Sequence, residues 1–98
     1  MKRNTKTFLD RLTKALGVTL TELQNGKIDR RLSDARAMTA ALLTTRYNLR
    51  QQELAGLFNT SQVAVSKMLQ RHTLKLIFSN SYQQKFNQVK DTLPVSKN

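Results

Sequence analysis

The chain has 98 residues, of which 17 are Lys or Arg and 6 are Asp or Glu, which gives a formal net charge of +11 at pH 7. This length allows one small domain with a single core, and the absence of cysteine excludes disulfides and thiolate metal sites. No apolar run approaches the roughly 20 residues of a membrane span, and the basic N-terminus leads into no apolar signal core, so a cytoplasmic protein is expected.

Three glycines, one proline and the lack of sustained period-two alternation predict an all-α fold of five or six helices around one core. In chain order, apolar residues at helical spacing predict a first helix over residues 8–16, which Gly17 ends. Thr19 and Glu22 then form a capping box that opens a single helical turn.

A longer helix follows a short basic connector. Asp29 or Ser33 is expected to cap this helix, which should run to about Arg46, where Tyr47 and Asn48 break it. Its alanines allow neighbouring helices to approach closely. Apolar residues at helical spacing define its predicted buried side, namely Leu32, Ala35, Met38 or Thr39, Leu42 and Leu43.

Residues 50–71 have the apolar spacing of a helix-turn-helix, the motif that inserts its second helix into the major groove of DNA. Asn59 falls in the turn, where a left-handed conformation is needed, and Asn tolerates that conformation second only to Gly. Ser61 is the natural N-cap of the second helix. The predicted inner faces hold Leu54, Ala55 and Phe58 on the first helix and Val65, Met68 and Leu69 on the second.

A final helix is predicted over about residues 80–92, capped by Ser79 or Ser81. Residues 1–93 are expected to form a single domain, and residues 94–98 a flexible tail. The buried face of the final helix is expected to hold Tyr82, Phe86, Val89 and Leu93.

Helical hairpins with the same apolar spacing also occur in bundles that bind nothing, and here the charge distribution favours nucleic acid. Between Glu53 and Asp91 the chain has no acidic residue, whereas five basic residues fall there. This part of the chain therefore carries an unopposed positive field, as expected of a protein that binds a polyanion. An anionic membrane surface is the electrostatic alternative, but no segment pairs a long apolar face with a basic one.

The exposed positions of the second helix carry side chains suited to base edges and phosphates. Gln62 can pair bidentately with adenine, and Lys67 can reach guanine or a phosphate. Val63 and Ala64 either touch thymine methyls, or one of the two faces the core. Arg50 begins the first helix, where backbone N–H groups also point toward a phosphate. The DNA-binding residues predicted on the second helix are Ser61, Gln62, Val63, Ser66, Lys67, Gln70 and Arg71.

Three segments of the chain occur in the order that a known family has. They are residues 8–23, residues 30–43 with their leading arginines, and the frame of Leu54, Phe58 and Val65. Together they resemble the C-terminal DNA-binding domain of the bacterial replication initiator DnaA, within the wider Trp-repressor-like group. At the recognition helix that family has an Asp-His-Thr or Asp-His-Ser run, where this chain has Ser-Gln-Val, and the turn here is one residue shorter. The resemblance therefore implies a DnaA-like fold with a different target sequence.

The resemblance also implies DNA contacts outside the helix-turn-helix. In the family, the basic stretch before the long helix reaches the minor groove, and the matching residues here are Lys27, Arg30 and Arg31. An arginine suits the negative potential of a narrow minor groove. Arg36 matches a family arginine that approaches the DNA backbone. The chain has no Gly-rich phosphate loop followed by Lys-Ser or Lys-Thr, so the ATP-driven step of the initiator is not expected.

No combination of residues resembles an active site. The chain has six carboxylates without acid–base spacing, one histidine and no cysteine. We therefore expect no enzymatic activity, no metal site, no cofactor and no small-molecule substrate. His72, the only histidine, is expected to be a structural or surface residue rather than a catalyst or ligand. The leading hypothesis is therefore sequence-specific binding of double-stranded DNA that regulates transcription or replication initiation, in the nucleoid of a bacterium or of the host of a mobile element.

Two alternatives stay open. The first is an accessory protein that binds DNA weakly and acts mainly by recruiting a protein partner of replication or transcription. The helix over residues 80–93 or the face of residues 8–16 would then be the docking surface, or the contact of a homodimer. The second is charge-driven binding of single-stranded nucleic acid or RNA, although the few aromatic residues are spread along the chain rather than gathered into a stacking platform.

Overall fold

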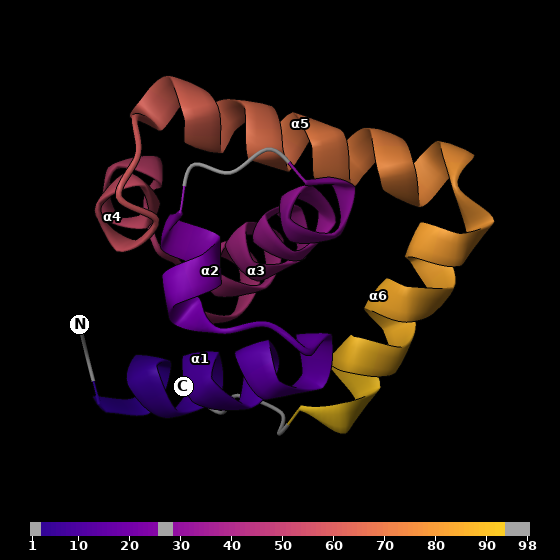
Figure 1. Ribbon diagram of the computed structural model, residues 1–98, viewed down its shortest axis with the longest axis horizontal. Coiled ribbons are helices and arrows are strands. Elements are labelled where there is room, and N and C mark those ends of the chain that lie inside the picture. The colour runs from indigo at the N-terminus through magenta and orange to yellow at the C-terminus, as the bar shows by residue number, and fades with distance from the viewer. Residues whose placement is uncertain (1–2, 26–28, 94–98) are drawn as a thin grey trace.

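Six α-helices make up most of the computed structural model, which describes residues 3–25 and 29–93 (Figure 1). No strand occurs within these two ranges, so the all-α prediction is confirmed. The helices are α1 (Arg3–Leu16), α2 (Leu20–Gln24), α3 (Arg30–Tyr47), α4 (Gln51–Leu57), α5 (Gln62–Phe78) and α6 (Asn80–Thr92).

Helix α3 lies in the middle of the molecule and packs against α1, α2 and α5 (Figure 1). The predicted buried side of α3 is confirmed, since Leu32, Leu42 and Leu43 are all buried. Ala37 and Ala40 are completely buried, and small side chains at these positions let the neighbouring helices come close. The buried hydroxyl of Thr39 donates to the carbonyl of Ala35, so the polar group costs little in the core.

The predicted helix ends are confirmed where local chemistry sets them. Gly17 adopts a φ of +72° after α1, a conformation that glycine reaches without steric cost. Thr19 and Glu22 form the capping box of α2, and the carboxylate of Asp29 accepts from the backbone N–H of Arg31 at 2.8 Å to cap α3. Asn48 ends α3 with a φ of 55°.

Helix α4 and helix α5 meet through a tight turn. Asn59 has a φ of 55° there, and the hydroxyl of Ser61 accepts from the N–H of Ala64 at 3.1 Å to cap α5, as predicted. The inner positions Leu54, Phe58 and Val65 are buried. Met68 and Leu69 are only partly buried, but both pack against the core.

The structure corrects the extent of two helices. Helix α1 begins at Arg3 rather than near residue 8. The apolar pattern missed this first turn because its buried position holds Thr5, which is polar. Helix α5 runs to Phe78 and not to about Arg71. Beyond Arg71 the sequence no longer alternates as an amphipathic helix does, because the inner residue His72 is polar and the exposed residues Leu74, Ile77 and Phe78 are apolar.

Helix α6 closes the fold against α1 and α5 (Figure 1). Ser79 caps it, and its predicted inner residues are all buried, namely Tyr82, Phe86, Val89 and Leu93. The tail predicted for residues 94–98 lies outside the described residues. Within the described ranges, no helix is both long enough and apolar enough to cross a membrane.

Candidate nucleic-acid interface

Helix α5 runs along one edge of the molecule, with α4 at its N-terminal end (Figure 1). Of the predicted base-reading residues on α5, Gln62, Val63, Lys67 and Gln70 are exposed. Val63 is 66% exposed, so it does not face the core. Two amides, a lysine and a valine therefore form an outward face that offers hydrogen-bond donors, acceptors and one methyl-bearing side chain.

Ser66 and Arg71 are more enclosed than predicted. Both are partly buried, and the Nε of Arg71 donates to the Oδ1 of Asp34 at 3.0 Å. The Nζ of Lys75 lies 3.6 Å from the same carboxylate oxygen. Asp34 thus counters part of the charge of the second half of α5, whereas Lys67 has no ion pair with any described residue.

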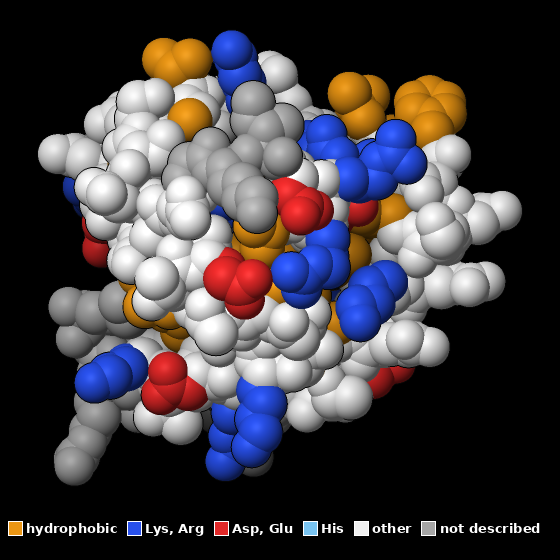
Figure 2. Space-filling model, viewed as in Figure 1, with side chains coloured by type: hydrophobic (Ala, Val, Ile, Leu, Met, Phe, Trp, Pro, Cys, Tyr) orange, Lys and Arg blue, Asp and Glu red, His pale blue; other side chains and the backbone are white. Residues whose placement is uncertain are grey.

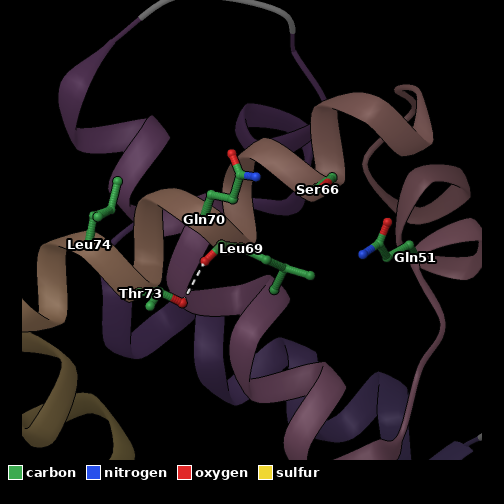
Figure 3. Close-up of a pocket in the computed structure, with 6 residues that line it drawn as sticks. All are labelled: Gln51, Ser66, Leu69, Gln70, Thr73 and Leu74. Atoms are coloured by element: carbon green, nitrogen blue, oxygen red, sulfur yellow. Dashed lines mark hydrogen bonds between the residues drawn. The ribbon is translucent and has the colours of Figure 1, made fainter.

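A shallow depression of about 520 Å³ lies between the start of α4 and the middle of α5 (Figure 3). Its polar lining residues carry amides and hydroxyls, the groups that bond base edges and phosphates without charge. Thr73 already uses its hydroxyl to donate to the carbonyl of Leu69 at 3.1 Å. The lining residues are Gln51, Ser66, Leu69, Gln70, Thr73 and Leu74.

The N-terminal end of α4 is less open to an anion than the sequence suggests. The backbone N–H of Arg50 donates to the Oε1 of Glu53 at 3.0 Å, so a carboxylate of the chain already occupies this end. A phosphate there would meet the negative charge of Glu53. The side chain of Arg50 is itself exposed, so the predicted phosphate contact would have to come from its guanidinium.

The start of α3 lies beside α5, because the Asp34–Arg71 bond joins the second turn of α3 to the middle of α5. Arg30 is exposed and lies one turn before Asp34 on the same side of α3. Lys and Arg side chains gather next to α5, with acidic side chains among them (Figure 2). The fold therefore brings Arg30 toward the same basic region as α5.

The other arginines of α3 are held by contacts within the chain. The guanidinium of Arg31 pairs with Glu22 at 3.3 Å and donates to the carbonyl of Gly17 at 3.2 Å. The Nε of Arg36 donates to the carbonyl of Leu23 at 2.9 Å, and its Nη2 donates to the carbonyls of Glu22 and Asn25.

These contacts have consequences for the implied DNA contacts. Arg36 caps the C-terminal end of α2, where backbone carbonyls lack partners and a cation is favoured. The sequence alone did not predict this role. A DNA contact by Arg36 would have to compete with three carbonyls, whereas Arg31 is exposed enough to exchange its partner. Lys27 lies outside the described residues.

The single histidine lies in the interior, on the opposite side of α5 from the outward face. The Nδ1 of His72 lies 2.7 Å from the hydroxyl of Tyr82, and its ring packs edge-on against Phe86. Burial lowers the pKa of His72. The described residues hold no group of three or more His, Cys, Asp or Glu side chains that could bind a metal ion.

Comparison with known protein families, curated proteins and solved structures found no match to this chain.

Proposed function

We propose that this chain is a sequence-specific, double-stranded DNA-binding protein in which α4 and α5 act as a helix-turn-helix of the DnaA and Trp-repressor type. The observation that carries the proposal is the outward face of α5, where Gln62, Lys67 and Gln70 project from a helix whose opposite side is anchored in the core. The left-handed Asn59 and the capping Ser61 give the turn and helix start that such a unit needs.

The proposed roles follow from side-chain chemistry and exposure. Gln62, in the first turn of α5, reads a base edge, and adenine is its best bidentate partner. Lys67 contacts guanine or a phosphate. The exposed methyl groups of Val63 meet a thymine methyl, a contact that its core alternative would have prevented.

Arg30 supplies the flanking contact. It is exposed at the start of α3, which lies beside α5, and its charge suits the adjacent minor groove. Arg71 and Lys75 contribute to the field but are partly neutralised by Asp34. The net charge of +11 strengthens binding to any duplex, and the α5 face supplies the sequence preference.

The test is selection of bound duplexes from a random pool at physiological salt. A recurring short motif, bound much more tightly than the unselected pool, supports sequence-specific binding. If no motif is enriched and duplexes of all sequences bind equally, the base-reading role of α5 is wrong. Competition with single-stranded DNA and RNA of the same length distinguishes duplex binding from simple attraction to a polyanion.

The second candidate function is that of an accessory protein that recruits a partner. One observation favours it: three large apolar side chains stand exposed at the end of α5, namely Leu74, Ile77 and Phe78. Both functions can belong to one molecule, with DNA-directed regulation of transcription or replication as the output.

A further inference from the structure

The last two turns of α5 present an apolar surface to solvent. Leu74 is 56% exposed, Ile77 66% and Phe78 81%. Ile77 and Phe78 follow Leu74 by three and four residues, so both lie next to Leu74 on one face of the helix. We call these three residues the α5 apolar patch. None of them belongs to the buried core, and apolar side chains stand out where α5 ends (Figure 2).

The size of the α5 apolar patch limits what can cover it. At these exposures the three side chains present on the order of 400 Å² of apolar surface, a size often linked to function on a small protein. A stable interface between two folded proteins buries about 800 Å² on each side. The patch is therefore too small to hold two copies of the chain together and suits a short segment of a partner.

The charge around the α5 apolar patch points to the same conclusion. Every charged residue of α5 is basic, because the chain has no acidic residue between Glu53 and Asp91. The single carboxylate of Asp34 pairs with both Arg71 and Lys75, so these two cations keep a net positive charge between them. A second copy with a charge of +11 would be repelled, whereas acidic flanks on a partner would be attracted.

We propose that the α5 apolar patch binds an acidic amphipathic helical segment of a partner protein. Apolar residues of the segment, three and four apart, cover Leu74, Ile77 and Phe78, and Asp or Glu residues beside them meet the cations of α5. Ile77 lies ten residues after Lys67, about 15 Å along the helix axis. Ile77 and Phe78 thus lie away from Gln62, Val63 and Lys67, while Leu74 also lines the depression beside Gln70. Peptide binding and DNA binding are therefore measured separately.

The test uses the full chain as bait for a displayed library of random peptides about 11 residues long, which is three helical turns. The enriched peptides are expected to combine apolar residues at helical spacing with an excess of Asp and Glu. A labelled synthetic copy of an enriched peptide should bind the I77S/F78S double variant about tenfold more weakly or worse. Its affinity for the unchanged protein should fall as salt is raised.

The matched control is Val63→Ser, because Val63 has the same 66% exposure as Ile77 but lies at the other end of α5. This variant should bind the peptide as the unchanged protein does. The substituted side chains are exposed, so far-UV circular dichroism should be unaltered, and Leu74→Ser provides a second, single-residue version of the test.

Three results would overturn the proposal. One is the absence of any peptide that prefers the unchanged protein over I77S/F78S. Another is enrichment of neutral or basic peptides. The third is a dimer in sedimentation that I77S/F78S dissociates, which would make a second copy the occupant. DNA binding by I77S/F78S is measured in parallel: peptide binding without DNA binding contradicts only the proposed function, and the reverse contradicts only the patch.

Discussion

The Nδ1 of His72 lies 2.7 Å from the hydroxyl of Tyr82, and this bond ties the second half of α5 to the first turn of α6. The ring of Phe86 packs against the same imidazole, with 4.5 Å between ring centroids. A polar pair therefore sits where an amphipathic helix would ordinarily place a leucine. The pair fixes how α6 docks, and it also makes the stability of the fold sensitive to pH.

Acidification should destabilise the protein through His72. The unfolded chain takes up a proton near the ordinary pKa of 6.5, whereas burial lowers the pKa of His72 in the folded state. The unfolded state then binds more protons than the folded state. The contribution of His72 to the free energy of unfolding is therefore fully present above pH 6.5, and it is lost as the pH falls toward the lowered pKa. Denaturant unfolding followed by circular dichroism over about pH 5 to 8 measures this slope.

His72→Gln is the control for that slope, because the chain has no other histidine. The variant is expected to be less stable overall and to lose the dependence on pH between about 5 and 7. An equal slope in the variant and the unchanged protein would assign the effect to other groups.

Tyr82→Phe should cost about 1–3 kcal/mol, because it leaves the buried Nδ1 of His72 without its partner while keeping the aromatic packing. Burial, followed by the charge of Asp34, raises the pKa of Tyr82 above its ordinary 10.0. The stability linked to this group is thus present below pH 10 and lost as the pH rises above it, and the variant should not show that loss.

Tyr47→Phe is the matched control for Tyr82→Phe, since Tyr47 is the only other tyrosine and is only partly buried. Its ring packs against Phe8 with 4.9 Å between centroids, a contact that phenylalanine preserves. Thermal melts at neutral pH should show a clearly smaller effect for Tyr47→Phe. Equal losses would contradict a special role for the Tyr82 hydroxyl.

Asn59 provides a test of the turn between α4 and α5. Its φ of 55° is left-handed, a conformation that Asn tolerates because its short polar side chain can hydrogen-bond locally and that Ala does not, so Asn59→Ala should cost about 1–2 kcal/mol. Asn59→Gly should be tolerated or slightly stabilising, because glycine adopts this conformation without the penalty. Chemical denaturation measures both variants. The order Ala below Asn and Gly is the expected result, and the reverse order would mean that the Asn side chain is needed for another reason.

The features that could be predicted from the sequence are those set by neighbouring residues. Gly17, Asn59 and Ser61 act within a turn of their own position, so their roles follow from local conformational preference and capping. The apolar inner faces of α3 and α6 were predicted for a similar reason, because helical spacing alone decides which residues share a side.

The features that could not be predicted depend on residues far apart in the chain. Arg36 caps α2 and Asp34 pairs with Arg71 only because tertiary packing brings them together. Nor could the pattern around His72 predict the true end of α5, since the partner that makes a buried histidine acceptable comes from α6. The outward face of α5 was predicted in part, with Ser66 and Arg71 more enclosed than expected.

Gln62→Ala tests base reading directly. On the duplex selected from a random pool, the variant should bind about 1–3 kcal/mol more weakly and should lose preference at one position of the motif. Gel-shift titrations on the motif and on single-base variants measure both effects. Gln84→Ala, at an exposed position of α6, is the control and should bind normally. An equal loss for Gln62→Ala on every duplex would contradict base reading.

Asp34→Asn tests how far the chain restrains its own positive charge. The variant frees Arg71 and Lys75 from a shared carboxylate and adds one unit to the net charge, so all duplexes should bind more tightly and the salt dependence should steepen. The pairs are partly exposed, so the loss in stability should stay within about 1 kcal/mol. Asp91→Asn makes the same change in charge at the far end of α6, and it should have a smaller effect if proximity to α5 matters. Equal gains for the two variants would mean that net charge, and not a focused basic region, controls affinity.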